Sequence, residues 1–160
     1  MTHDTLKAFG YPDTIISDYQ NWVVLLRPHQ ATLGALVIVH KSEATAFSEI
    51  DSTSFAELEN VIKDCEAVLG HMFSYQKINY MMLMMNDPHV HYHVIPRYDS
   101  VRSFHGLDFE DLGWPALPQL GAGHKVNDQI RAALTTDIKD VWSKYKELSF
   151  DDAKTSGRAV

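Results

Sequence analysis

The sequence between positions 86 and 97 reads Asn86-Asp87-Pro88-His89-Val90-His91-Tyr92-His93-Val94-Ile95-Pro96-Arg97. Three of the nine histidines of the chain stand here at a strict spacing of two residues, separated by β-branched or aromatic residues. A period of two is the period of a β-strand, in which successive side chains point to opposite faces. The stretch therefore predicts a strand with His89, His91 and His93 on one face and an apolar row facing a core.

A row of imidazoles on one sheet face has three interpretations. The first is a polar surface that happens to be rich in histidine. The second is a metal site, but strand residues rise about 3.3 Å each, so the Cα atoms of His89 and His93 would lie roughly 13 Å apart. Metal–nitrogen bonds are only about 2.0–2.1 Å long, which allows a neighbouring pair of ligands more readily than all three. The third is catalysis, with a central nucleophile or base whose neighbours bind an elongated anion.

The motif resembles the signature of the histidine triad family, in which His-x-His-x-His is followed by two apolar residues. In that family the middle histidine attacks the α-phosphorus of a nucleotide ester or amide, and water then releases a nucleoside monophosphate from the nucleotidyl-histidine. The resemblance implies that His91 is the nucleophile. It also implies that His89 and His93 orient His91 and stabilise the charge that develops on the phosphoryl oxygens.

The same resemblance implies three substrate-binding residues. Asn86 stands where members place an amide against the phosphate, and Asn79 matches an asparagine found earlier on the preceding strand. Local backbone hydrogen bonding is the alternative role of both side chains. Arg27 opens a segment that resembles the family's ribose- and base-binding stretch. No metal ligand and no tightly bound cofactor is implied, and any Mg²⁺ would arrive with a polyphosphate substrate.

The chain departs from the family pattern in two places. Gly34-Ala35 stands where many members have Gly-His, so a supporting fourth histidine is missing. The loop before the triad is short and lacks the hydroxyl that helps to protonate a leaving group. Substrates with a phosphate leaving group need less of that help, which favours dinucleoside polyphosphates over amine-releasing substrates.

Composition limits the class of protein. A net charge of −7 argues against a nucleic-acid polymer as partner, because phosphate backbones are held by clustered Lys and Arg. The single cysteine, Cys65, excludes an internal disulfide and a four-cysteine zinc site, and its apolar surroundings predict a core thiol. No apolar run reaches transmembrane length, so we expect a cytoplasmic protein that does not bind a membrane.

Two apolar runs, 21–27 and 33–41, predict a pair of antiparallel strands joined by a turn. Gly34 falls inside the second run, where a bulge and the close approach of a ligand or another backbone explain it equally well. The first twenty residues show no clear pattern, and we expect them at the periphery. Apolar residues at helical spacing predict a long helix to Phe73 that starts near Asp51, Ser52 or Ser54.

A third strand is expected over 76–85, followed by a tight turn at 86–88 that leads into the histidine strand. The five residues 81–85, four of them methionines, are expected to pack in the core. After Tyr98 the chain is expected to be irregular through Gly123, then helical from about Asn127 or Asp128, with a frayed tail from Asp151.

These elements predict an α+β fold, namely an antiparallel sheet with a long scaffold helix and a C-terminal helix. We expect a single domain over 1–160, with a core at about 21–97 and an extension over 98–160, that pairs into a homodimer as family members usually do. The expected function is a nucleotidyl hydrolase of dinucleoside polyphosphates such as diadenosine tetraphosphate. A nucleotidyltransferase or phosphorylase, a non-catalytic nucleotide sensor and a metal-dependent hydrolase remain the alternatives.

Overall fold

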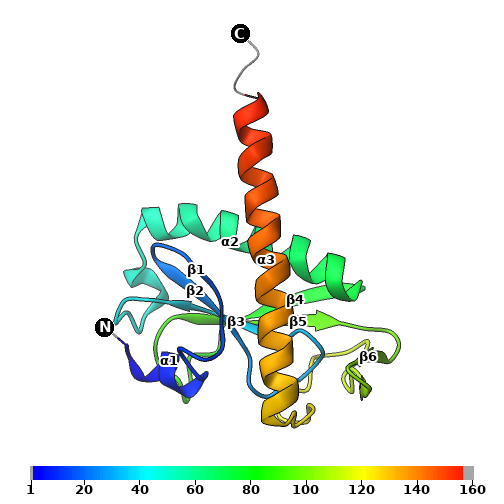
Figure 1. Cartoon of the computed structure of the whole chain (residues 1–160). Helices are drawn as coiled ribbons and strands as arrows, with labels where there is room; N and C mark the ends of the chain where they lie inside the picture. Colours follow the sequence, from blue (N-terminus) through cyan, green and yellow to red (C-terminus); the bar gives the residue numbers. More distant parts are fainter. Residues whose placement is uncertain (1, 157–160) are drawn as a thin grey trace.

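A computed structural model describes residues 2–156 and shows a twisted antiparallel sheet with helices on both faces (Figure 1). The sheet has five strands in the order β1-β2-β3-β5-β4, and all neighbouring strands are antiparallel. The strands are β1 (Ile15–Asp18), β2 (Trp22–Leu26), β3 (Leu36–His40), β4 (Lys77–Met81) and β5 (His91–Arg97). The predicted α+β class and the antiparallel pairing of β2 with β3 and of β4 with β5 are confirmed.

The larger core lies between the sheet and two helices, α2 (Ser52–Phe73) and α3 (Asp128–Ser156). Side chains alternate along β3, so Leu36 and Ile38 face these helices while Val37 and Val39 face the opposite side of the sheet. The expected apolar row of the histidine strand also joins the larger core, with Val90 and Val94 fully buried and Tyr92 partly buried.

A smaller core covers the opposite face of the sheet. It consists of Val37, Val39 and two strand-β2 residues packed against Leu6 and Phe9, which belong to or follow the short helix α1 (Asp4–Ala8). His91 pairs with Val39 and His93 with Val37, which places both histidines on this face. The histidine face of the sheet is therefore the face that the N-terminal segment covers.

The expectation of a peripheral N-terminus was wrong. Strand β1 pairs with β2, and Leu6 is buried against the sheet. The sequence prediction failed because β1 is only four residues long and α1 only five, too short to show a hydrophobic period. These two elements complete the sheet and the covering of its histidine face.

Helix α2 begins after Asp51, which settles its start among the three alternatives. The carboxylate of Asp51 accepts a hydrogen bond from the backbone N–H of Ser54 at 2.8 Å, a standard N-cap contact. Cys65 is fully buried in the larger core, as predicted. The helix ends at Phe73, and its C-cap residue Ser74 has a left-handed conformation with φ of 49°.

Gly34 lies in the loop between β2 and β3, not in a strand as predicted. Its φ is +82°, a conformation that residues with a Cβ rarely adopt. A Cβ at this position would stand 2.8 Å from the ring of Phe73 at the end of α2. Neither expected explanation, a bulge or the approach of a ligand or another backbone, accounts for this glycine: the positive φ in a loop and the Phe73 side chain do.

The chain before and after the histidine strand also differs from expectation. Strand β4 ends at Met81, so the expected tight turn is a longer loop over 82–90. The stretch after Tyr98 contains a two-stranded hairpin of β6 (Arg102–Phe104) and β7 (Leu107–Phe109). These strands have three residues each, too few for a period-two pattern to stand out.

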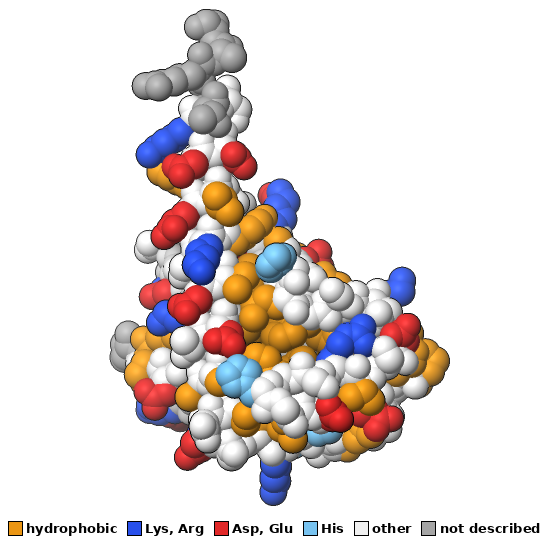
Figure 2. Space-filling model, turned by 45° about the vertical axis from the view of Figure 1, so that its right-hand side comes forward, with side chains coloured by type: hydrophobic (Ala, Val, Ile, Leu, Met, Phe, Trp, Pro, Cys, Tyr) orange, Lys and Arg blue, Asp and Glu red, His pale blue; other side chains and the backbone are white. Residues whose placement is uncertain are grey.

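Helix α3 starts at Asp128, and Asn127 accepts a hydrogen bond from the backbone N–H of Ile130. It continues to Ser156, so the expected fraying from Asp151 is wrong as far as the structure describes the chain. Figures 1 and 2 show the C-terminal part of this helix standing away from the body, with charged side chains of both signs along it. Hydrophobic side chains gather beside its lower half in Figure 2. Within residues 2–156, no helix combines the length and apolar character needed to cross a membrane.

Candidate active site

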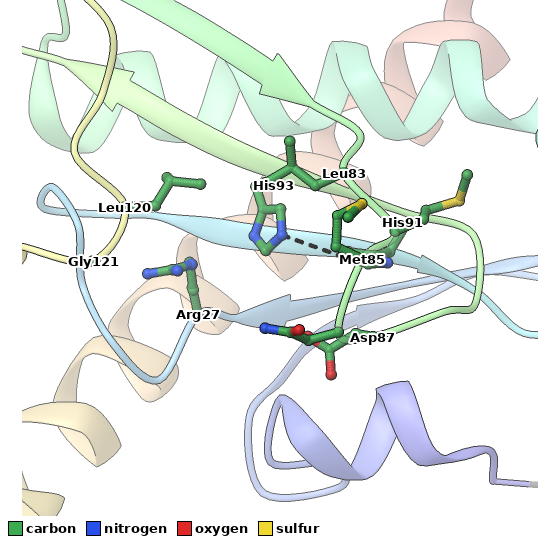
Figure 3. A pocket seen from close by; sticks show the side chains of 10 residues that line it. Arg27, Leu83, Met85, Asp87, His91, His93, Leu120 and Gly121 are labelled. Atoms are coloured by element: carbon green, nitrogen blue, oxygen red, sulfur yellow. Dashed lines mark hydrogen bonds between the residues drawn. The ribbon is translucent and has the colours of Figure 1, made fainter.

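A cavity of about 310 Å³ opens at the start of the histidine strand, on the face covered by α1 (Figure 3). It is formed by Arg27, which directly follows β2, by the loop before β5, by β5 itself and by the segment before α3. Its lining residues are Arg27, Leu83, Met84, Met85, Asn86, Asp87, His91, His93, Leu120 and Gly121. Four of the six predicted site residues, Arg27, Asn86, His91 and His93, therefore lie in one cavity.

The orientation of His91 follows from its hydrogen bonds. Nδ1 of His91 lies 2.6 Å from the backbone oxygen of His89, and a carbonyl oxygen only accepts hydrogen bonds. Nδ1 therefore carries the hydrogen, and Nε2 of the neutral ring keeps its lone pair. His91 is 1% exposed, and its Nε2 faces His93 at the cavity wall. The arrangement directs the Nε2 lone pair of His91 toward His93 at the cavity wall.

His93 is the hydrogen-bonding partner of that lone pair. The two Nε2 atoms are 3.3 Å apart, so His93 donates its Nε2–H to the unprotonated nitrogen of His91. Burial lowers the pKa of His93 to about 4, and unfavourable electrostatic interactions with His91 and Arg27 add to the effect. Nδ1 of His93 is buried and, within the described residues, has no hydrogen-bond partner. His93 is thus held neutral as a donor toward His91.

Arg27 supplies the positive charge of the cavity. Its Nη1 donates to the backbone oxygen of His29 at 2.5 Å, while Nε is buried and unpartnered within residues 2–156. A buried polar atom without a partner costs about 1–3 kcal/mol, so a ligand that bonded this nitrogen would recover that free energy. Figure 3 shows His93 lying between Arg27 and Met85, with Asp87 at the rim toward α1. Asp87 is the acidic side chain of this cavity, and the sequence analysis assigned it only to a turn.

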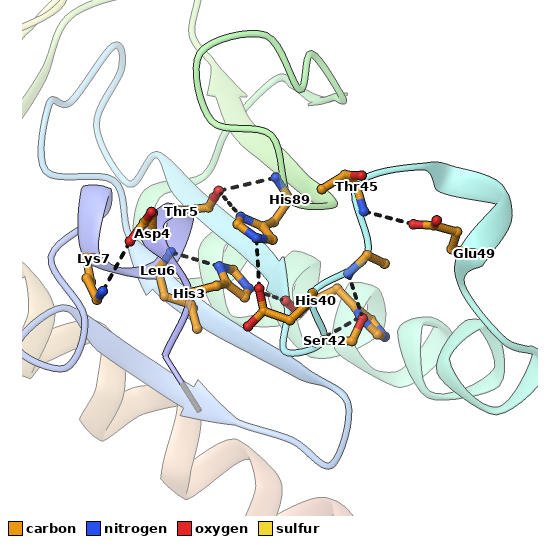
Figure 4. A network of polar contacts seen from close by, with 12 residues as sticks. His3, Asp4, Thr5, Leu6, Lys7, His40, Ser42, Thr45, Glu49 and His89 are labelled. Atoms are coloured by element: carbon orange, nitrogen blue, oxygen red, sulfur yellow. Dashed lines mark hydrogen bonds and ion pairs between the residues drawn. The ribbon is translucent and has the colours of Figure 1, made fainter.

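His89 lies outside the cavity. It precedes β5, and its imidazole stacks on that of His3, with ring centroids 3.9 Å apart. Nδ1 of His89 lies 2.9 Å from Oγ1 of Thr5, and Nε2 lies 3.2 Å from the carboxylate of Glu43 (Figure 4). The expectation that the imidazoles of His89 and His93 both flank His91 in the site holds only for His93. The backbone carbonyl of His89 is what contacts His91.

Asn79 also lies elsewhere. It sits on β4, and its side-chain oxygen accepts a hydrogen bond from Nη1 of Arg97 at 2.8 Å. The guanidinium of Arg97 is buried and pairs with Asp111 through two nitrogens, at 2.7 and 3.2 Å. Asn79 lines a separate hollow beside Trp114 at the outer edge of the sheet. The structure therefore does not bring Asn79 together with the histidines.

The methionine run has two roles. Met82 and Met84 pack partly against the larger core, which confirms part of the prediction. Met84 and Met85 also line the histidine cavity, and Met85 is 83% exposed, so packing in the core does not explain the whole run. The sequence did not predict that Met84 and Met85 line the cavity, because these residues lie in a loop, where side chains do not alternate between two faces.

Several residues around the site carried no sequence signal at all. Phe9 packs against both cavity histidines, with centroid distances of 5.5 Å to His91 and 5.6 Å to His93. Leu120 and Gly121 reach the cavity from the irregular segment before α3. In the part of the chain that the structure describes, no group of three or more His, Cys, Asp or Glu side chains is arranged to hold a metal ion.

Comparison with protein families matches residues 10–100 to the HIT domain model. This match begins before the region 21–97 that carried the resemblance in the sequence, because β1 belongs to the fold. Among curated protein sequences, none matches this chain.

Several solved structures share the fold at low sequence identity. A histidine triad protein from Marinobacter aquaeolei has a TM-score of 0.69 at 18% identity, covering 90% of this chain and 96% of its own. A histidine triad (HIT) protein from Sinorhizobium meliloti has a TM-score of 0.68 at 18% identity, with coverage of 88% and 95%. A histidine triad protein from Bradyrhizobium japonicum has a TM-score of 0.67 at 20% identity, with coverage of 90% and 96%.

Proposed function

Because this chain belongs to the HIT domain family, we propose that it is a nucleotide-binding hydrolase that cleaves at an α-phosphate through a covalent intermediate on His91. The observation that carries the proposal is the hydrogen bond between Nδ1 of His91 and the backbone oxygen of His89. It fixes the tautomer in which Nε2 is unprotonated at the cavity wall. A neutral imidazole with an available lone pair is a competent nucleophile near neutral pH.

In the first step, the lone pair on Nε2 of His91 forms a bond to the α-phosphorus. The bond from phosphorus to the bridging oxygen breaks, and its electron pair leaves with the departing phosphate group. In the second step, water attacks the same phosphorus and loses its proton to solvent. The phosphorus–nitrogen bond then breaks, which returns the lone pair to Nε2 and releases a nucleoside monophosphate. Splitting the displacement in two lowers each barrier.

The other cavity residues supply charge and shape for such a substrate. The unpartnered Nε of Arg27 and the Nε2–H of His93 are donors available to phosphoryl oxygens. Leu83, Met85 and Leu120 offer an apolar wall for a base. We propose a dinucleoside polyphosphate as substrate, since its phosphate leaving group departs with little protonation.

The test is product analysis with diadenosine tetraphosphate, diadenosine triphosphate and an adenosine phosphoramidate, combined with intact-mass spectrometry of the protein. We expect AMP from the polyphosphates and an adenylyl adduct that maps to His91. In His91→Ala, AMP release should fall by at least about 10³-fold and the adduct should disappear, while nucleotide binding remains. The matched control is His71→Ala, which removes an exposed histidine at the end of α2.

Each alternative predicts a different outcome. A transferase or phosphorylase would form the adduct but release little AMP until phosphate or a sugar phosphate is added. A nucleotide sensor would bind the same compounds with neither adduct nor product. Activity of the parent that is lost to a chelator, and that persists in His91→Ala when metal is restored, would contradict the proposal in favour of metal-dependent hydrolysis.

A further inference from the structure

The imidazole of His89 is buried and fully hydrogen-bonded, although it does not line the cavity. Its Nε2 faces the carboxylate of Glu43 at 3.2 Å, and an ionised carboxylate only accepts hydrogen bonds. Nε2 of His89 therefore carries a hydrogen. Nδ1 on the other side of the ring lies 2.9 Å from the hydroxyl oxygen of Thr5, with which it shares a hydrogen bond.

Thr5 holds the backbone of His89 as well as its ring. The backbone N–H of His89 donates to Oγ1 of Thr5 at 3.3 Å, so one hydroxyl contacts His89 twice. Thr5 is 1% exposed, which excludes water as a competitor for these bonds. The carbonyl of this same residue, His89, accepts the hydrogen bond from Nδ1 of His91.

His3, in the N-terminal segment, packs against the other side of this network by stacking on His89. His3 stacks on His89 with an interplanar angle of 15°. Its Nδ1 accepts from the backbone N–H of Leu6, and its Nε2 lies 2.9 Å from the backbone oxygen of His40, to which it donates. Burial lowers the pKa of His3, which keeps the stacked ring neutral beside His89. Figure 4 shows these contacts joining α1, the start of β5 and the segment after β3.

We propose that Thr5 and Glu43 are positioning residues for His91, acting through His89. They fix the backbone of His89 so that its carbonyl oxygen stays on Nδ1 of His91 and Nε2 of His91 stays unprotonated at the cavity. The inference rests on the proposed role of His91 as the nucleophile. Its specific content is that residues of α1 and of the segment after β3, none of which lines the cavity, set the tautomer of the reacting ring.

The first variant is Thr5→Val, which keeps the shape of the side chain and removes the hydroxyl. Two quantities are measured: the tautomer of His91, by long-range ¹H–¹⁵N correlation spectra of the histidine rings, and steady-state kinetics with the polyphosphate that the parent cleaves best. We expect the single Nδ1–H form of His91 to give way to a mixture of tautomers. We also expect kcat to fall about 10- to 100-fold with KM within about twofold, the range for residues that orient a reacting group. Thr5→Ser, which restores the hydroxyl, should recover both.

The matched control is Thr135→Val on α3, which removes another buried threonine hydroxyl, one that donates to its own helix backbone. It should leave the tautomer and kcat as in the parent. Glu43→Ala tests the other anchor without threatening the fold, since the Glu43 side chain is largely exposed. It should shift the tautomer of His91 in the same direction and lower kcat by about two- to fivefold.

A Thr5→Val protein in which His91 keeps its single tautomer and its kcat would overturn the inference. So would unchanged spectra in Glu43→Ala, which decides the matter if the valine variant does not fold. If the parent turns over none of the nucleotides, the proposed function fails. The ring spectra of the variants still decide whether Thr5 and Glu43 set the tautomer of His91.

Discussion

Nε2 of His91 lies 3.3 Å from Nε2 of His93, and the two rings meet nearly edge to face at 78°. Only one hydrogen fits between these nitrogens, and it belongs to His93 because Nδ1 of His91 already carries the hydrogen of its own ring. In the proposed reaction, a phosphoryl group on Nε2 of His91 releases this N–H to bind a phosphoryl oxygen. The pair therefore combines a nucleophile with a donor for the charge that it creates.

Stability should fall on acidification through His93. Its pKa is about 4 in the folded protein because burial, His91 and Arg27 disfavour the charged ring, against about 6.5 in an unfolded chain. As the pH falls below 6.5, the unfolded chain takes up the proton first, so the free energy of unfolding declines until about pH 4. The difference of about 2.5 units corresponds to about 3 kcal/mol.

Urea denaturation of the parent and of His93→Gln at pH 7, 5.5 and 4 measures this effect. The parent should lose about 3 kcal/mol more than the variant over this interval, because His3, His29 and His40, whose pKa values burial also lowers, contribute equally to both proteins. Parallel curves for the two proteins would show that His93 does not titrate in this range.

The next prediction concerns Arg27. In Arg27→Gln we expect KM for a polyphosphate to rise about 10- to 100-fold, because the positive charge beside the cavity and the buried, unpartnered Nε are lost. The measurement is initial-rate kinetics at fixed ionic strength. Arg131→Gln is the control, since Arg131 forms an exposed ion pair with Asp128 on α3. Equal KM values for the parent and Arg27→Gln would remove Arg27 from the proposed substrate contacts.

The sequence predicted the sheet where its strands were long enough to show their period. The runs at β2, β3 and β5 contain five to seven residues and were located within a few residues of their observed ends. Strands β1, β6 and β7 have three or four residues, so their formation depends on neighbouring strands rather than on their own pattern. Strand β4 was predicted to continue to residue 85 but ends at Met81. The prediction was too long because apolar residues continue into the loop that forms the cavity.

The site was predictable where a motif or a family resemblance marks it. His91 and His93 follow from their spacing, Asn86 from the resemblance beside that motif, and Arg27 from a separate segment that resembles the family. Thr5 and Glu43 are separated from His89 by 84 and 46 residues, and nothing local in the sequence indicates that they meet it. Period two also predicted that all three imidazoles project from one strand face, whereas the chain enters β5 only at His91 and turns the imidazole of His89 toward α1.

Gly34 and Gly106 form a matched pair for a stability test. Both have positive φ, +82° and +77°, but a Cβ at Gly34 would meet the ring of Phe73 at 2.8 Å whereas nothing lies within 4 Å of one at Gly106. Gly106→Ala should cost about 1–2 kcal/mol from the backbone conformation alone. Gly34→Ala should cost about 1–3 kcal/mol more, because the ring or the end of α2 must shift. Urea denaturation measures both, and equal losses would show that Phe73 moves freely.

The two asparagines separate a cavity residue from a structural one. Asn86 is exposed at the cavity, so Asn86→Ala should leave the free energy of unfolding within about 0.5 kcal/mol of the parent. It should lower kcat/KM about tenfold if its amide contacts the phosphate, as proposed from the family resemblance. Asn79→Ala should do the reverse. Loss of its oxygen leaves Nη1 of the buried Arg97 without its 2.8 Å acceptor, which costs about 1–3 kcal/mol of stability, while kcat/KM stays within about twofold. Urea denaturation and initial rates on the same preparations decide between the assignments. A catalytic loss in Asn79→Ala without a loss of stability would return this residue to the substrate site.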